Sequence, residues 1–173
     1  PEHLPCGLSR RETARLLGRW PDSPAGLVPR LMYGTGARVT EALRLRVKDI
    51  DFDLRTVTIR GGKGDKDRIT VLPASLVPAL HRQLAERKRL HSIDLACGMV
   101  DVETPHALDR KYPNACREWG WQWIFATADY NTCPRTGAIR RHHLHSKTIQ
   151  KTMRAAVIRA GLTKPATPHT LRH

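Results

Sequence analysis

Apolar residues recur at intervals of three and four along most of the chain, which predicts amphipathic helices. Residues 9–12 (SRRE) form a capping-box pattern that opens a first helix over about 9–18. Residues 22–24 (DSP) supply a cap and a first-turn proline for a second helix, which Pro29 is expected to kink or delay and which Gly34 and Gly36 end. Further helices are expected over about 38–46 and 75–91, from a cap at Ser146 to Gly161, and from Thr167-Pro168 onward.

Strand-like alternation is confined to a few short stretches. Residues 56–59 (TVTI) and 68–71 (RITV) alternate with a period of two and flank a basic, glycine-rich loop, which predicts a β-hairpin. Residues 121–126 could form one more short strand, whereas 93–118 and 128–145 have little periodicity. The predicted fold class is therefore mainly α with a small antiparallel β-sheet (α+β). The charged run over 82–89 is expected to face solvent and to pair with Glu86.

The charge balance narrows the possible partners. The 173 residues contain 30 Lys and Arg against 16 Asp and Glu, giving a net charge of +14. A basic domain of this kind usually binds a polyanion, and nucleic acid is the leading candidate. No apolar stretch of 18 residues and no signal-peptide pattern occurs, so we expect neither a membrane span nor secretion.

The four cysteines are far apart and form no CxxC pair, which favours a reducing cytoplasm over a disulfide framework. The chain begins with Pro1 rather than Met and ends at His173, inside an apparent helix start. These two ends lead us to expect a fragment of a longer protein, consisting of one partial domain over 1–173.

Four cationic or titratable residues, remote in sequence, could surround one phosphate. Arg38 follows the Gly34–Gly36 turn, Lys63 lies at the tip of the predicted hairpin, and His169 and Arg172 are three apart at a helix start. Phosphoryl transfer needs mainly positioning and neutralisation of the oxygens, and the planar fork of arginine suits both. Each feature alone has an ordinary explanation, as a solvated arginine, a loop lysine or a chance HxxR match.

The order of these features resembles that of the tyrosine recombinases. Residues 34–45 (GTGARVTEALRL) resemble the box of the family's first catalytic arginine. Residues 47–51 (VKDID) and 62–68 (GKGDKDR) resemble the hairpin of its catalytic lysine, and 167–173 (TPHTLRH) resemble its HxxR box. The resemblance extends over nearly the whole chain from about residue 25. Residues 107–123 (ALDRKYPNACREWGWQW) and 140–143 (RRHH) further resemble the insertion of the integron integrases, which would lie within 93–145.

This resemblance implies a function and a role for each catalytic residue. Integron integrases integrate and excise gene cassettes by breaking and rejoining DNA strands through a phosphotyrosine intermediate. Arg38 and Arg172 would clamp the scissile phosphate, Lys63 would donate a proton to the leaving oxygen, and His169 would act as acid/base or phosphate hydrogen-bond partner. The resemblance also implies an N-terminal domain that closes around DNA and a C-terminal tyrosine segment, both absent here. Because Tyr33, Tyr112 and Tyr130 match no nucleophile box, we expect this fragment to bind DNA without cleaving it.

The resemblance also implies a particular DNA ligand. Integron integrases bind cassette sites folded as single-strand hairpins, as well as double-stranded sites, and recognise the hairpins by their extrahelical bases. Trp121, Pro134, His142 and His143 match the positions of the base pocket. Trp119, Trp121 and Trp123 would share one face if they lay on a strand, with Trp119 and Trp123 either in the core or facing DNA. Arg135, Arg140, Arg141 and Lys147 are expected to be contacts to the DNA backbone or a solvated basic face.

Other classes remain open from the residues alone. His142, His143 and His145 near Cys133 invite a zinc site, but their spacing fits no standard one, and the resemblance implies neither a metal nor another cofactor. A DNA-binding module related to recombinases but without chemistry is the main alternative. A basic RNA-binding protein is another, and it would not require Arg38 or Arg172. The resemblance implies that the full-length protein acts as a homotetramer on DNA, with no membrane association.

Overall fold

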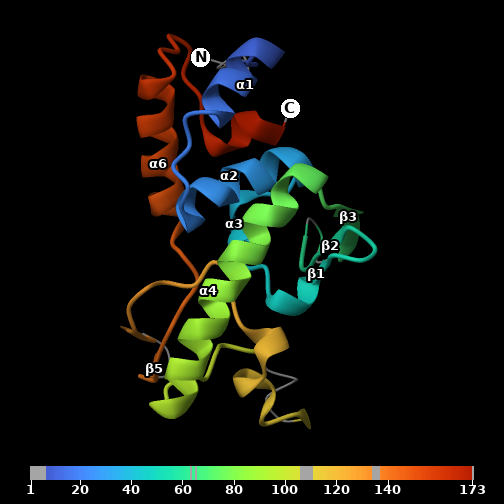
Figure 1. Cartoon of the computed structure of the whole chain (residues 1–173), viewed down its shortest axis with the longest axis vertical. Helices are drawn as coiled ribbons and strands as arrows, with labels where there is room; N and C mark the ends of the chain where they lie inside the picture. Colours follow the sequence, from blue (N-terminus) through green and yellow to red (C-terminus); the bar gives the residue numbers. More distant parts are fainter. Residues whose placement is uncertain (1–6, 63, 65, 106–110, 134–136, 173) are drawn as a thin grey trace.

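The computed structural model describes residues 7–62, 64, 66–105, 111–133 and 137–172, with only the backbone of Arg172 (Figure 1). The helices in this part of the chain are α1 (Arg10–Leu17), α2 (Pro24–Thr35), α3 (Val39–Leu43), α4 (Val77–Ala96) and α6 (Ser146–Arg159). The strands are β1 (Ile50–Asp51), β2 (Thr56–Ile59), β3 (Arg68–Val71), β4 (Asn131–Thr132) and β5 (Ile139–Arg140). The prediction of a mainly helical fold with a small antiparallel sheet is confirmed.

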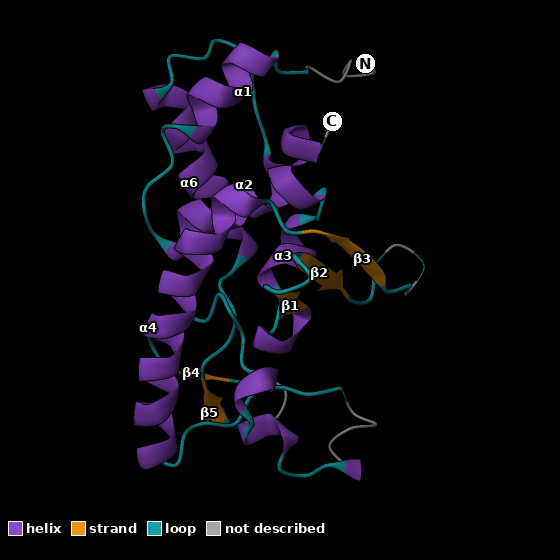
Figure 2. Cartoon of the chain, turned by 45° about the vertical axis from the view of Figure 1, so that its right-hand side comes forward, coloured by secondary structure: helices purple, strands orange, loops and turns teal. Residues whose placement is uncertain are grey.

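The first three strands form one antiparallel sheet in the order β1-β2-β3. Thr56 pairs with Val71 and Ile59 with Arg68, as the alternating pattern predicts for a hairpin. Figure 2 shows this hairpin projecting from the side of the molecule that carries α3. β4 and β5 form a separate pair of two residues each, at the lower end of α4 in Figure 1.

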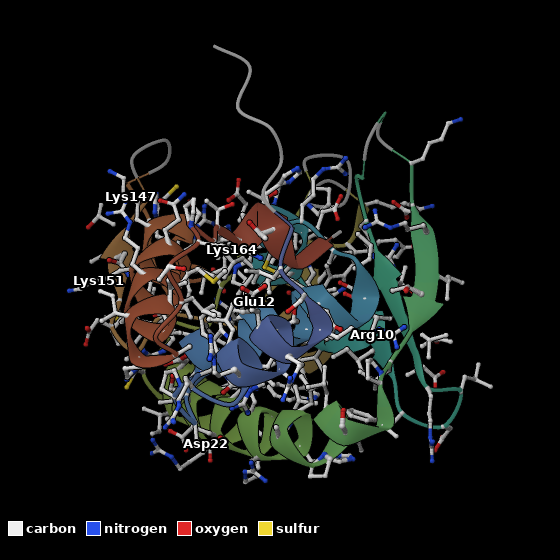
Figure 3. All side chains as sticks on the ribbon, turned by 90° about the horizontal axis from the view of Figure 1, so that it is seen from above. Arg10, Glu12, Asp22, Lys147, Lys151 and Lys164 are labelled. Atoms are coloured by element: carbon white, nitrogen blue, oxygen red, sulfur yellow. The ribbon has the colours of Figure 1, made fainter. Side chains whose placement is uncertain are left out.

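Two clusters of buried apolar side chains hold the helices together. The larger one joins α2, α3, β2 and the upper half of α4, and it also includes Ile124 and Phe125. The smaller one joins Leu16 and Trp20 at α1 to Met153 of α6 and Leu171 near the end of the chain. The segment 168–172 is therefore fixed by its own buried leucine. An ion pair of 3.0 Å between Glu12 and Lys164 adds a second tie between α1 and the chain leading to this segment, and both residues are labelled in Figure 3.

Several helix boundaries differ from the predicted ones. α2 begins at Pro24 and contains Pro29 as a buried residue, so the expected delay of its start is wrong. α3 ends at Leu43 rather than near Arg46, because the chain leaves the helix there and Arg46 forms an isolated β-bridge with Trp123. α4 continues to Ala96, beyond the expected end at 91. The side chain that caps α6 is His145, one residue before the predicted Ser146.

The predicted strand over 121–126 is wrong. Residues Trp119–Trp121 form a single 3-10 turn, and only isolated bridges from Arg46 to Trp123 and from Ala126 to His143 follow. Ile124 and Phe125 are completely buried next to each other, so both faces of this segment are covered by protein. A half-exposed strand would instead bury alternate residues.

Candidate phosphate site and nucleic-acid interface

Arg38 stands where α2 gives way to α3. Gly36 ends α2 in the left-handed conformation with φ 67°, which a residue without Cβ adopts at little cost. Arg38 is then the N-cap residue of α3, and its backbone N–H donates to Oε2 of Glu41 at 2.8 Å. Its Nη1 donates to Oε1 of the same carboxylate at 2.8 Å, while 38% of its side chain stays exposed. The guanidinium is thus oriented by one carboxylate and still open to a ligand.

Glu41 connects Arg38 to the hairpin. Nη2 of Arg68, the first residue of β3, donates to Oε2 of Glu41 at 2.7 Å. Burial alone would raise the pKa of Glu41, but the hydrogen bonds from Arg68 and Arg38 outweigh it and lower that pKa to about 2. Glu41 is therefore ionised at neutral pH and holds the two arginines together.

The base of the hairpin loop packs against this cluster. A Cβ added to Gly62 would lie 2.9 Å from Nη1 of Arg68, 2.9 Å from the carbonyl oxygen of Lys66 and 3.6 Å from Oε1 of Glu41. Only a glycine fits this approach without a shift of its neighbours. Lys63 follows Gly62 directly, but Lys63 itself lies outside the described residues.

His169 lies across from Arg38. The helix expected from Thr167-Pro168 onward is present as a 3-10 helix over Pro168–Arg172. One hollow of about 290 Å³ is lined by both Arg38 and His169, together with Met32, Val39, Thr40 and Pro168. Because a 3-10 helix has three residues per turn, the backbone of Arg172 lies one turn from that of His169. The side chain of Arg172 is outside the described part of the structure.

A larger hollow adjoins this one at Thr40, and another larger hollow adjoins that one in turn. The first, of about 550 Å³, again includes Thr40 and reaches His143 and His145; the second, of about 380 Å³, reaches Lys48 and Arg60. The two share Arg44, Arg46, Pro105 and Trp123 in their linings. Cations outnumber the carboxylates Glu41, Asp49 and Glu103 along these walls, so the surface favours an anionic ligand.

Arg46 organises the aromatic side of these hollows. Its guanidinium lies 3.7 Å from the ring centre of Trp123 and 5.3 Å from that of Trp121. Its Nη1 donates to the carbonyl oxygen of Trp121 at 2.7 Å, and its Nη2 to that of Glu103 at 2.6 Å. Burial lowers the pKa of Arg46 to about 10, which leaves it charged at neutral pH. Lys48 Nζ lies 2.9 Å from the ring centre of Trp121 on the second hollow.

The predicted base-pocket residues do not all line one hollow. His143 lines the first and meets the ring of Trp123 edge-on at 5.3 Å, whereas Trp121 lines the second. His142 is half-buried beside His143, and burial, followed by the nearby Arg140, lowers its pKa. Pro134 lies outside the described residues, as does Arg135.

The tryptophans do not share one face, contrary to the strand prediction. Trp123 is only 4% exposed and belongs to the protein interior. Trp119 is half-buried, with its ring 5.5 Å from that of His91 and Nζ of Lys88 4.7 Å from its centre. Trp121 alone of the three lines a hollow without being buried.

Two predictions about basic surfaces are confirmed only in part. Arg140 and Arg141 are buried, so they do not form a solvated face, and Arg141 pairs with Asp94. Within the run over 82–89, Arg89 does pair with Glu86, but Arg87 is 2% exposed. Lys147 is exposed on α6 and projects outward in Figure 3.

Sequence reasoning missed the residues that connect the site. Glu41, Arg44, Arg46 and Arg68 lie within or beside the boxes quoted above, but nothing in their spacing indicates their partners. A carboxylate three residues after Arg38 was the one available signal, since it can cap the turn that Arg38 begins. Among the described residues, no group of three or more His, Cys, Asp and Glu side chains could hold a metal ion, and no helix is long and apolar enough to cross a membrane.

Comparisons with known proteins show which family the chain belongs to. The model of the phage integrase family matches residues 23–173. Proteins described as integrase/recombinase from Escherichia coli and Pseudomonas aeruginosa are each 48% identical over 170 residues, covering 98% of this chain and 50% of the relative. The crystal structure of XerA recombinase superimposes with a TM-score of 0.65 at 26% identity, over 100% of this chain and 50% of that one. XerH recombinase bound to its palindromic difH substrate matches the fold with a TM-score of 0.63 at 23% identity, over 99% of this chain and 41% of that one.

The chain belongs to the phage integrase family, which is the family of the tyrosine recombinases. Its described residues form the catalytic-domain fold of that family. It spans about half the length of the curated relatives that it matches.

Proposed function

We propose that this chain is the DNA-binding and phosphate-activating part of a site-specific recombinase of the integron type. The complete enzyme would integrate and excise gene cassettes by breaking and rejoining DNA strands through a phosphotyrosine intermediate. The observation that carries this proposal is the hollow shared by Arg38 and His169, which are remote along the chain. Cationic and hydrogen-bonding groups that converge from remote elements suit a single phosphate.

Each catalytic residue then has a defined task. Arg38 holds non-bridging oxygens of the scissile phosphate with its planar guanidinium, and Arg172 holds the same phosphate. His169 exchanges a proton with the attacking oxygen or binds a phosphate oxygen. Lys63, next to the packed Gly62, donates a proton to the leaving oxygen. No metal and no other cofactor takes part in this scheme.

The basic hollows beyond Arg38 provide the path for the DNA. Backbone phosphates lie along Arg44 and Lys48, which are exposed, while Trp121 and His143 offer ring surfaces for bases. Stacking of a base on an aromatic ring is worth about 1–3 kcal/mol and depends little on its identity. An already extrahelical base costs little to place there, so a folded single-strand cassette hairpin is the preferred ligand, with double-stranded sites bound as well. His142 and Pro134 complete the base pocket, and four copies of the full-length enzyme assemble on two sites.

Residues 1–173 bind such DNA but do not cut it. Cleavage needs a tyrosine hydroxyl at the phosphate. Tyr33 lines a separate apolar hollow, Tyr112 is exposed outside the described hollows, and the hydroxyl of Tyr130 donates to Asp94 at 2.6 Å. None of the three lines the hollow of Arg38 and His169.

Binding to two matched DNA hairpins tests the proposal. We expect the chain to bind a cassette hairpin with protruding bases about tenfold more tightly than the fully paired version, the value of one stacked base. Fluorescence anisotropy measures both dissociation constants. The salt concentration is kept the same for both hairpins, because salt weakens the binding of DNA to any basic surface. Equal affinities would contradict the proposed base pocket and would support only general DNA binding.

The main alternative is a DNA-binding module related to recombinases that performs no chemistry. A reading frame that continues past His173 to a tyrosine box would exclude this alternative. Stronger binding to RNA than to the DNA hairpin would instead favour an RNA-binding protein.

A further inference from the structure

The buried face of α4 is apolar in the first half of the helix and polar in the second half. Its first half buries Leu80 and contributes it to the larger apolar cluster. Its second half buries Arg87, His91 and Asp94, which are 2%, 4% and 2% exposed. Together with Gln83 these residues are spaced by four, four and three, so they form one row on one face of the helix. We call Gln83, Arg87, His91 and Asp94 the polar row.

Three members of the polar row form hydrogen bonds with the backbone of residues 117–124, the segment that contains the three neighbouring tryptophans. Nε2 of Gln83 donates to the carbonyl oxygen of Ile124 at 2.8 Å, and Nε of Arg87 to that of Trp123 at 3.1 Å. Nε2 of His91 bonds to the carbonyl oxygen of Arg117 at 2.9 Å. Residues 117–124 make only short 3-10 turns and single bridges, so their buried carbonyl groups need side-chain donors. The polar row supplies these donors from a straight helix.

The last member of the row holds the following loop. Nε of Arg141 donates to both carboxylate oxygens of Asp94, at 3.0 and 2.8 Å, and the hydroxyl of Tyr130 donates to one of them. Nη1 of Arg141 also donates to the carbonyl oxygen of Ala128, and its guanidinium lies 4.3 Å from the ring centre of Tyr130. In Figure 1 the lower end of α4 lies beside β5, the strand that leads into Arg141. His142 and His143 follow this anchored arginine directly.

A buried ion pair of this kind is an inefficient way to stabilise a fold. Desolvation of Asp94 and Arg141 offsets much of their attraction, and an apolar pair of the same size is often as stable. What the pair does provide is a single arrangement, because neither charge tolerates a shifted partner. Arg141 is only 7% exposed, so it is not available to contact DNA itself.

We propose that the polar row positions the base-binding side chains, with Asp94 as the positioning residue that fixes His143 relative to Trp121. This inference rests on the proposed function, because it concerns how the chain distinguishes extrahelical bases. The row acts on the DNA only through the segments 117–124, 127–133 and 137–143, which it contacts directly or through Arg141. Its loss therefore lowers discrimination between hairpins more than it lowers affinity for paired DNA.

The test compares Asp94→Asn with the unchanged 173-residue chain on the two hairpins described above. We expect the preference for protruding bases to fall about tenfold, towards equality, the value of one lost stacking contact. Affinity for the fully paired hairpin should stay within about twofold, because the exposed cations are untouched. If the single variant fails to fold, the same comparison is made with the double variant Asp94→Asn/Arg141→Gln, which leaves no unpaired buried charge. Its preference for protruding bases should fall in the same way. Glu86→Gln is the matched control, since it breaks an exposed pair with Arg89 at 2.7 Å on the same helix, and it should leave the preference unchanged.

Each outcome separates positioning from stability and from the proposed function. An unchanged preference in a folded Asp94 variant overturns the inference, and so does an equal loss of affinity for both hairpins. If the unchanged chain shows no preference, the base pocket of the proposed function is contradicted, and amide hydrogen exchange then tests the positioning by itself. Faster exchange in Asp94→Asn over 117–143, with β2 and β3 unaffected, supports the inference. Unaltered exchange over 117–143 overturns it.

Discussion

Arg38→Ala lowers the rate of DNA strand cleavage by on the order of 100-fold in a recombinase that carries these residues together with a tyrosine nucleophile. The guanidinium lies in the hollow with His169. The proposed function places the scissile phosphate there, and its oxygens gain negative charge in the transition state. Removing one preorganised donor from such a site costs roughly 100- to 1,000-fold in rate. Single-turnover cleavage of a labelled DNA site measures the effect without a contribution from product release.

A charge-matched variant separates this effect from a general loss of positive charge. Arg89→Ala also removes an arginine that pairs with a glutamate three residues away, in this case Glu86 at 2.7 Å. Arg89 lines none of the hollows described above, so we expect cleavage to stay within about twofold, as for most surface changes. Equal cleavage rates for Arg38→Ala and the unchanged enzyme would show that Arg38 has no role in catalysis.

Glu41→Gln makes the protein less stable at pH 7 by roughly 3 kcal/mol, the free energy that corresponds to a pKa lowered from 4.5 to about 2. The carboxylate is buried and accepts hydrogen bonds from Arg38 and Arg68, which hold its pKa at about 2 against an ordinary value of 4.5. A lowered pKa in the folded state means that this stabilisation is fully present above pH 4.5. It is lost progressively as the pH falls from 4.5 through 2, because protonated glutamic acid then resembles glutamine. The stability difference between the two proteins should therefore shrink over the same range.

Urea unfolding at pH 7, pH 4 and pH 3 measures this difference. Glu86→Gln is the control, because Glu86 pairs with Arg89 on the exposed side of α4 and its loss should have a much smaller effect. A Glu41→Gln protein as stable as the unchanged one at pH 7, or a difference that grows on acidification, would contradict the proposed role of Glu41.

Local patterns predicted the elements well where short-range rules decide them. The capping box at Ser9, the proline at the start of α2 and the alternation of β2 and β3 each depend on neighbours in sequence. The end of α3 and the absence of a strand at 121–126 depend instead on the pairing of Arg46 with Trp123, which are remote along the chain. The length of α4 was underestimated because its second half buries charged residues, which are almost never buried unless paired.

The candidate site was predictable in part for the same reason. The positions of Arg38 and His169 followed from motifs and their order, and the structure brings these two residues to one hollow. The role of Arg46 follows only from the return of residues 121–123 to its side, and that of Arg87 only from the carbonyl groups that reach it. No pattern within either local segment contains that information. The separation of Trp121 and His143 into two adjoining hollows likewise depends on tertiary packing.

The most direct test of the central claim is a scan of single neutral phosphates along a bound DNA hairpin. A methylphosphonate replaces one charged phosphate oxygen by a methyl group, so it weakens binding by any side chain that contacts that phosphate. A variant that has already lost this contact is not weakened further. At that position the unchanged chain and the variant therefore bind with equal affinity. We predict that one and the same position has this effect for both Arg38→Ala and His169→Ala. Two different positions, or no such position for either variant, would contradict the convergence of these residues on one phosphate.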